Sequence, residues 1–178
     1  MRYIGIVLMA SAVTAGGFLC AATLKTRLEI MMITQRMIGD LKTRILYTND
    51  ALPEALLEVG TQHLNRYDGV YKEPARMFIS ISGKLGEESG RPYPEVWSEG
   101  VITMSAHVPI SKHDRKMLLD LGSSLGYADR EMQERTLQFY LKQAEESIAA
   151  IKQEMAEKES LYRSLGVAGG LFLVIFFI

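Results

Sequence analysis

Cysteine is almost absent from this sequence of 178 residues, and neither sign of charge dominates it. The single cysteine, Cys20, cannot form an internal disulfide, and it lies in an apolar run where a buried, inert thiol is expected. The 20 basic residues nearly balance the 21 acidic ones, so the formal net charge is −1. A nucleic-acid-binding protein needs a clustered positive surface to displace counterions from phosphates. Nucleic acid is therefore not expected as a partner.

Motifs of catalysis and metal binding are also lacking. The sequence contains no P-loop, dinucleotide fingerprint, nucleophile elbow or metal-spaced Cys/His pair. His63, His107 and His113 fall in different segments without ligand spacing, so each is interpreted as an ordinary surface or partly packed residue. The run from Ser111 to Asp114 contains catalytic residue types, but helix neighbours point in different directions and capping accounts for it better. We expect no enzyme, cofactor, metal or small-molecule substrate, with a membrane enzyme using scattered carboxylates as a weaker alternative.

Alternating patterns typical of β-strands are missing as well. The length of the chain suits one domain of ordinary size. Apolar residues recur at helical spacing in segments separated by short breaks rich in glycine and proline. The expected fold class is all-α, an antiparallel helical bundle of about six helices. The expected helices cover approximately residues 25–47, 49–63, 73–87, 93–106, 111–122 and 129–162.

Several helix starts carry capping residues. Asn49 or Asp50 can cap the second helix, Ser111 with Asp114 forms a variant of the capping box, and Asp129 can cap the last helix. The last helix has apolar residues at alternating spacings of four and three, which is the geometry of a seam along an antiparallel neighbour. That neighbour should be the first helix. The seam consists of Leu137, Leu141, Ala144, Ile148, Ile151 and Met155.

Long apolar runs stand only at the two ends of the chain. Residues 3–24 carry no charge, and about 20 such residues suffice to cross a hydrocarbon core of about 30 Å. The second run, residues 165–178, would reach only about 21 Å as a helix, although Arg163 could extend it by snorkelling. We expect an N-terminal transmembrane anchor at 1–24, a helical soluble domain at 25–162 and a C-terminal anchor at 163–178. A cleaved signal peptide and a buried core helix are the respective alternatives.

The distribution of basic residues suggests which side the middle domain occupies. Five Lys and Arg residues follow the first apolar run closely, whereas only Arg2 precedes it. The positive-inside rule then places the middle domain in the cytoplasm of a multi-pass membrane protein, with membrane lipid as one partner. The five residues are Lys25, Arg27, Arg36, Lys42 and Arg44.

Four stretches, taken in order, carry a resemblance to a known family. They are Ile45 to Tyr47 with Ala51 to Leu56; Val96-Trp97 with Glu99; Leu121 to Gly126 with Asp129 to Gln133; and Ser164 to Gly166. Together with the apolar ends, they resemble the stage III sporulation protein AB family of endospore-forming bacteria over essentially the whole chain. Two positions depart from the family pattern: Arg44 stands where an acidic residue is usual, and Asp50-Ala51 where Thr-Pro is usual. These departures put in doubt any polar contact at that helix end.

The resemblance implies a membrane component of the channel-like complex between mother cell and forespore. Its soluble domain would be similar to the platform proteins of type II secretion and type IV pilus systems, which sit beside a secretion ATPase. The implied partners are the stage III sporulation ATPase and the other channel-complex proteins. The expected function is therefore a non-enzymatic scaffold of a sporulation complex.

Eight residues are candidates for docking a partner: Tyr47, Glu54, Trp97, Gly122, Gly126, Asp129, Arg130 and Gln133. Two interpretations of the turn around Gly122 and Gly126 stay open, a purely structural turn or a docking surface that includes Arg130 and Gln133. Trp97 is interpreted as a core anchor more readily than as an exposed docking residue. The alternative function, a membrane-bound signalling adaptor, would need a ligand pocket or a switchable polar core, and the sequence offers no obvious buried charge cluster.

Overall fold

The computed structural model describes the backbone of residues 2–48, 50–87, 90–125 and 129–177, and the side chains of 21–48, 50–87, 90–125, 129, 131–158 and 161. Within these ranges the chain is all-helical, with six α-helices and no strand, as expected. The α-helices are α1 (Arg2–Thr43), α2 (Leu52–Leu64), α3 (Glu73–Glu87), α4 (Tyr93–His107), α5 (Lys112–Leu125) and α6 (Arg130–Phe177). A π-helical turn, η1 (Arg44–Thr48), follows α1, and a 3₁₀ turn, η2 (Gly69–Lys72), precedes α3.

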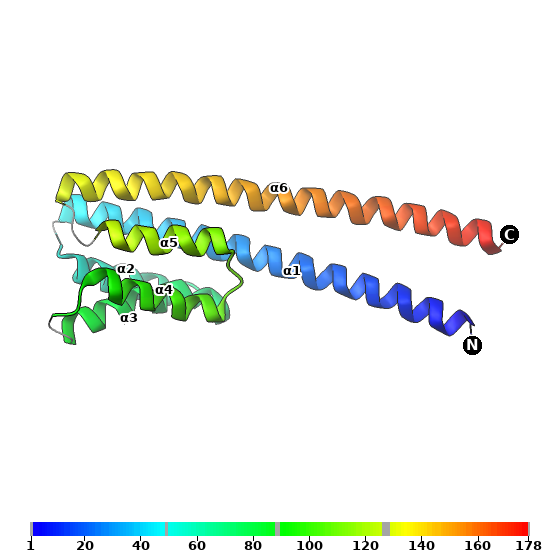
Figure 1. The fold of residues 1–178 in the computed structure, drawn as a ribbon, viewed down its shortest axis with the longest axis horizontal. Helices are drawn as coiled ribbons and strands as arrows, with labels where there is room; N and C mark the ends of the chain where they lie inside the picture. Colours follow the sequence, from blue (N-terminus) through cyan, green and yellow to red (C-terminus); the bar gives the residue numbers. More distant parts are fainter. Residues whose placement is uncertain (1, 49, 88–89, 126–128, 178) are drawn as a thin grey trace.

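The six helices form a closed cycle in which each packs against its neighbours in the chain and α6 packs against α1. The two long helices, α1 and α6, lie side by side, and both termini are at the same end of the molecule (Figure 1). The short helices α2 to α5 pack beside the parts of α1 and α6 that are remote from the termini (Figure 1). We call the end of the bundle opposite the termini the distal end. There α1 leads through η1 into α2, and α5 leads into α6.

The core is built from one apolar face of each helix, as helical periodicity requires. Trp97 and Phe78 are the largest fully buried side chains, and α1 contributes Ile30, Met31 and Ile38. The seam expected on α6 faces this core: Leu137, Ala144, Ile148 and Ile151 are buried, and Leu141 and Met155 are partly buried against the core. Burying each large aliphatic side chain stabilises the fold by about 1.5–3 kcal/mol relative to exposure. The predicted pairing of the first and last helices is therefore confirmed.

A multi-pass membrane location was the expectation from the two apolar ends, and it is contradicted. In the part of the chain that the structure describes, no helix combines the length and the apolar composition needed to cross a bilayer. The reason is that charges recur along the described stretches of the long helices, as at Lys25, Arg27 and Glu29, while the apolar side chains between them face other helices. The flanking transmembrane helices of the predicted fold are accordingly unsupported. The apolar segments 3–24 and 163–178 fall almost entirely outside the residues whose side chains are described.

The predicted helix caps are confirmed at two starts and wrong at a third. The amide of Asp114 donates to Ser111 Oγ at 3.0 Å at the start of α5, and the amide of Met132 donates to Asp129 Oδ1 at 2.8 Å at the start of α6. At α2, however, the N-cap is Ala51, which makes no side-chain cap bond. Asp50 is not the cap because α2 begins one residue later than expected from it, at Leu52. Its carboxylate pairs with Arg44 instead, and Asn49 lies outside the described residues. Helices α1 and α6 run unbroken through residues 24–25 and 162–163, so secondary structure marks no domain boundary there.

Candidate functional site

Most of the candidate docking residues gather at the distal end, because three chain reversals meet there. The turn through η1 into α2, the start of α4 and the passage from α5 to α6 all lie at this end (Figure 1). Stretches that are far apart in the sequence are thereby brought together. Gly126 lies outside the described residues, and so does the side chain of Arg130.

Trp97 and Gly122 form the packed interior of this end. The Trp97 indole is fully buried, and its Nε1 donates to the carbonyl oxygen of Leu118 at 2.7 Å. Its ring centroid lies 5.7 Å from that of Phe78 and 5.8 Å from that of Tyr93. Gly122 is buried beneath the indole and leaves no space for a side chain. Both residues therefore lie beneath the surface of the distal end. Neither can contact a partner unless the helices at this end move apart.

Tyr47, Glu54 and Asp129 remain accessible at the surface of the distal end. Tyr47 is 82% exposed, which is unusual for a large aromatic side chain. Asp129 is exposed as well and at the same time caps α6. Gln133 is half-buried, and its Nε2 donates to the carbonyl oxygen of Leu125 at 3.3 Å, which ties α6 to the end of α5.

Met132 belongs to the same exposed surface and was missed in the sequence. It is 53% exposed on the first turn of α6, one residue before Gln133. No local pattern distinguishes it from a core methionine, because its exposure depends on how α6 is rotated against α1. Tyr47 and Met132 are thus two large apolar side chains that the distal end exposes to water. Exposed apolar groups of this kind are typical of protein-binding surfaces.

Ion pairs hold the rim of the distal end. Arg44 pairs with Asp50 at 3.4 Å and with Glu58 at 3.0 Å. The two positions that depart from the family pattern, Arg44 and Asp50, therefore contact each other, so one departure compensates the charge of the other. Lys42 links α1 to α6 through Glu134 at 3.6 Å.

The α4 face that carries Glu95 and Glu99 is also an ion-pair network. Glu99 contacts Lys84 at 2.5 Å and Arg91 at 3.2 Å, and Arg91 also contacts Glu95 at 2.8 Å. The hydrogen bond from Lys84 is the largest influence on the pKa of Glu99 and lowers it. Burial, the next largest, opposes this effect, and Arg91 adds to the lowering. This network fastens α3 to α4 and neutralises much of the acidic face.

A groove runs along α6 away from the distal end. It has a volume of about 630 Å³ between the outer sides of α1 and α6. Phe139 stands in it with 55% of its side chain exposed, among charged side chains of both signs. The remaining lining residues are Lys42, Arg135, Gln138, Leu141, Lys142 and Glu145.

A buried polar cluster joins three helices near the start of α5, and sequence analysis did not find it. Asp114 is fully buried and pairs with Arg27 of α1 at 2.8 Å. It also accepts hydrogen bonds from Ser111 and from Ser147 of α6. Burial is the largest single influence on the pKa of Asp114 and raises it, but the hydrogen bonds and the Arg27 charge together outweigh burial and lower the pKa. The helical position of Asp114 could have revealed its burial, since it shares a face with Met117, Leu118 and Leu121.

His63 is also buried, which the sequence interpretation as a surface or partly packed residue did not anticipate. Its Nε2 lies 2.7 Å from Asp40 Oδ2, and its ring stacks on Tyr67 with centroids 6.0 Å apart. Among the described residues its Nδ1 has no hydrogen-bond partner. The histidine thus connects α2 to α1. Among the residues with described side chains, no group of three or more His, Cys, Asp or Glu could hold a metal ion.

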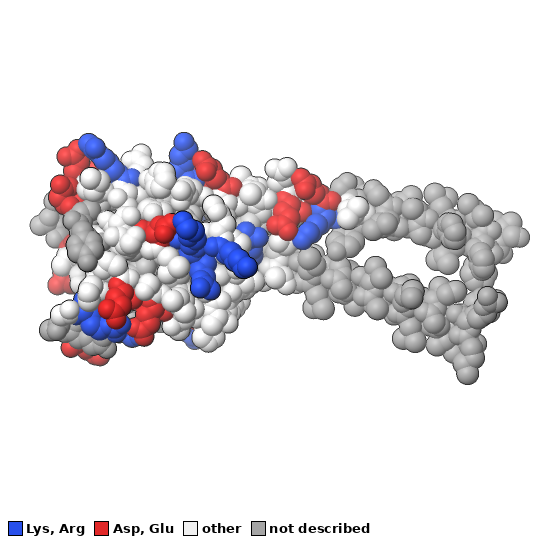
Figure 2. Space-filling view, viewed as in Figure 1, with Lys and Arg blue, Asp and Glu red and all other residues white. Residues whose placement is uncertain are grey.

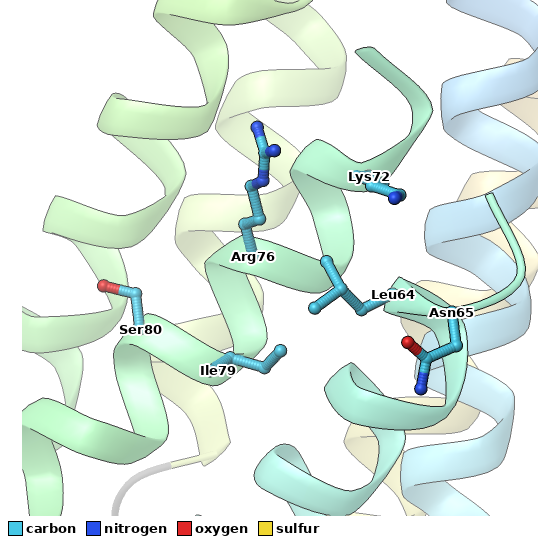
Figure 3. Close-up of a pocket in the computed structure, with 6 residues that line it drawn as sticks. All are labelled: Leu64, Asn65, Lys72, Arg76, Ile79 and Ser80. Carbon is cyan, nitrogen blue, oxygen red and sulfur yellow. The ribbon is translucent and has the colours of Figure 1, made fainter. Parts of the chain in front are cut away.

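A smaller pocket of about 380 Å³ lies between the end of α2 and α3 (Figure 3). Leu64 and Ile79 form its centre, while Asn65, Lys72, Arg76 and Ser80 stand around it (Figure 3). Its two cations are already paired, Lys72 with Asp68 at 3.2 Å and Arg76 with Glu73 at 2.5 Å. The pocket is therefore an apolar hollow bordered by two ion pairs.

Comparisons with known proteins agree on one relationship. The family model described as Stage III sporulation protein AB (spore_III_AB) matches residues 2–178. The curated Stage III sporulation protein AB of Bacillus subtilis (strain 168) is 23% identical over 177 residues, which cover 98% of each protein. A solved structure of Stage III sporulation protein AB is similar in fold, with a TM-score of 0.64 and 19% identity, covering 74% of this chain and 97% of that one.

Proposed function

The chain belongs to the stage III sporulation protein AB family, and on this basis we propose that it is a non-enzymatic scaffold of a sporulation stage III complex. The partner that we propose is the secretion-type ATPase of that complex, with the other channel-complex proteins as further neighbours. The docking surface is the distal end. The observation that carries this proposal is the exposure of Tyr47 and Met132 at an end where Trp97 and Gln133 tie α4, α5 and α6 together.

Rigid support for exposed apolar side chains is what a protein-binding surface requires. Aromatic and methionine side chains are enriched at interfaces, and few residues carry most of the binding energy. At the distal end, the Trp97 indole bridges α4 and α5, and the Gln133 amide ties α6 to α5. Tyr47 and Met132 are thus presented on a frame that loses little conformational entropy when a partner binds.

The electrostatics of the distal end favour a partner with basic residues. Glu54 and Asp129 are exposed, and neither forms an ion pair within the described part of the chain, while Arg44 is already occupied by Asp50 and Glu58. A docking partner would therefore offer Lys or Arg around an apolar centre. Such rim charges affect association rate and salt dependence more than affinity.

The test is binding of the purified chain to the stage III sporulation ATPase, measured by calorimetry. Tyr47→Ala and Met132→Ala are expected each to weaken binding about tenfold or more, as truncation of a central apolar contact does. Ile102→Ala is the matched control, because Ile102 is 52% exposed on α4 and belongs to no part of the distal end. Equal affinity for all four proteins would remove the distal end from the proposal. An ATPase that does not bind even the unsubstituted chain would remove the partner.

A second candidate function, a signalling adaptor, is favoured by one observation. The cluster of Asp114, Arg27 and Ser147 is a buried polar contact that links α1, α5 and α6. An adaptor that passes a conformational change from one helix to another needs a contact of this kind. The adaptor predicts that Asp114→Asn alters affinity for a partner bound at the distal end. The scaffold predicts that this substitution lowers stability and leaves that affinity unchanged.

A further inference from the structure

The first turns of α5 present a surface of one charge sign. Between His107 and Leu119 every exposed ionisable side chain is basic or histidine, and the single acidic residue, Asp114, is turned into the core. Figure 2 shows Lys and Arg side chains gathered over α5 in the middle of one face of the molecule. We call this surface the α5 basic face, and it consists of Lys112, His113, Arg115 and Lys116.

The charges of the α5 basic face are largely uncompensated by the chain itself. Lys116 contacts Asp120 at 3.1 Å, but a solvent-exposed pair one turn apart contributes little. Lys112 and Arg115 form no ion pair within the described residues. The carboxylate of Asp114 belongs to the same turns of α5, but Arg27, Ser111 and Ser147 hold it in the core. It therefore does not neutralise the cations at the surface. The buried cluster therefore maintains the net positive charge of the surface above it.

We propose that the α5 basic face binds an acidic segment of a partner protein at a site separate from the distal end. Charge complementarity identifies the partner: Lys112, Arg115 and Lys116 together attract carboxylates spaced over about one helical turn. The size of the surface favours a short segment over an extended negatively charged plane. Figure 2 shows Asp and Glu side chains elsewhere on the same face, and these would repel such a plane.

The experiment measures fluorescence anisotropy of a labelled peptide of about ten glutamates, titrated with the full chain at low salt. We expect Arg115→Glu/Lys116→Glu to weaken binding at least tenfold. The matched control is Lys142→Glu/Lys152→Glu, which changes the net charge equally on exposed positions of α6 and should bind as the unsubstituted chain does. Circular dichroism checks that both variants fold.

Three outcomes would overturn the proposal. Equal weakening by the α5 and α6 variants would mean that only net charge matters, and absence of peptide binding to the unsubstituted chain would mean that no such site exists. The third outcome concerns the class of partner. Binding to vesicles of phosphatidylglycerol and phosphatidylcholine, without binding to the peptide, would assign the face to an anionic lipid surface instead. Because the ATPase takes no part in this assay, its result is independent of the proposed docking at the distal end.

Discussion

The indole of Trp97 lies so close to Gly122 that a Cβ atom at residue 122 would come within 2.0 Å of the ring carbon Cδ1. This contact joins two of the stretches by which the chain resembles its family, one in α4 and one at the end of α5. The resemblance at these positions therefore reflects packing. The tryptophan requires a residue without a side chain on the opposite helix, and the glycine is needed for its size and not for unusual backbone angles.

Gly122→Ala is expected to destabilise the protein strongly. The added methyl group overlaps a rigid ring, so the indole must move and lose its hydrogen bond to the Leu118 carbonyl. Overpacking of this kind costs about 1–3 kcal/mol, and a lost buried hydrogen bond adds about 1 kcal/mol. Urea unfolding followed by tryptophan fluorescence measures the effect, and Trp97 is the only tryptophan in the chain.

Gly83→Ala is the control for the Gly122 substitution. Gly83 lies inside α3 and a Cβ there meets nothing within 4 Å. Alanine should therefore stabilise the helix by about 0.5–1 kcal/mol. If both substitutions changed the urea midpoint in the same direction, the close approach of Trp97 to Gly122 would not be the cause.

Asp114→Asn is expected to change the acid dependence of stability. The folded-state pKa of Asp114 is lowered, so its ionised form stabilises the fold above the unfolded-state pKa of about 3.9, and this contribution is lost as the pH falls through the folded value. The variant should be less stable by about 3 kcal/mol near neutral pH, because Arg27 loses its buried partner. The difference between the two proteins should narrow below about pH 4. An unchanged difference at acid pH would mean that Asp114 does not titrate as described.

Asp129→Ala separates capping from docking at the distal end. Loss of the bond to the Met132 amide should lower the unfolding free energy by about 1 kcal/mol. Asp129→Ser keeps a capping oxygen and removes the charge, so it should nearly restore stability. ATPase binding then distinguishes the roles: if Asp129 also contacts the partner, the serine variant stays stable but shows a slower association rate.

The pair of Arg44 and Asp50 should behave as a coupled unit. Arg44→Glu places a third carboxylate beside Asp50 and Glu58 and should cost about 1 kcal/mol. Adding Asp50→Lys to that variant should recover part of the loss, and a double-mutant cycle measures the coupling. Lys152→Glu, at an exposed position that forms no ion pair among the described residues, should change stability by less than about 0.5 kcal/mol.

Helix positions were predictable from the sequence because each helix has its own apolar stripe and stop signals. The expected start of the fourth helix at residue 93 and its apolar residues Trp97, Val101 and Met104 agree with α4. The caps at Ser111 and Asp129 were predictable for the same reason, since they depend on neighbours within three residues. The prediction of a cap at Asp50 was wrong because α2 begins at Leu52, so that Ala51 occupies the N-cap position and Asp50 pairs with Arg44.

Features that depend on contacts across the bundle were not predictable. The pairing of Arg27 with Asp114 spans 87 positions, and no spacing rule connects these residues. The exposure of Met132 depends on the rotation of α6 against α1, which periodicity leaves open for a residue at the edge of a stripe. The membrane prediction relied on apolar composition at the ends and found no support in the described helices.

The closed cycle of helices has a consequence for the order in which the chain can fold. The apolar stripe of α1, with Ile30, Met31 and Ile38, is covered by α6, whose contacting residues lie roughly a hundred positions later. During synthesis from the N-terminus, α1 leaves the ribosome with this stripe uncovered, while the hairpins of α2 with α3 and of α4 with α5 can already form from local contacts. Closure by α6 must then be the late and slow step of biogenesis. Truncation or delayed translation of α6 would leave a partly folded, aggregation-prone intermediate that needs protection by chaperones.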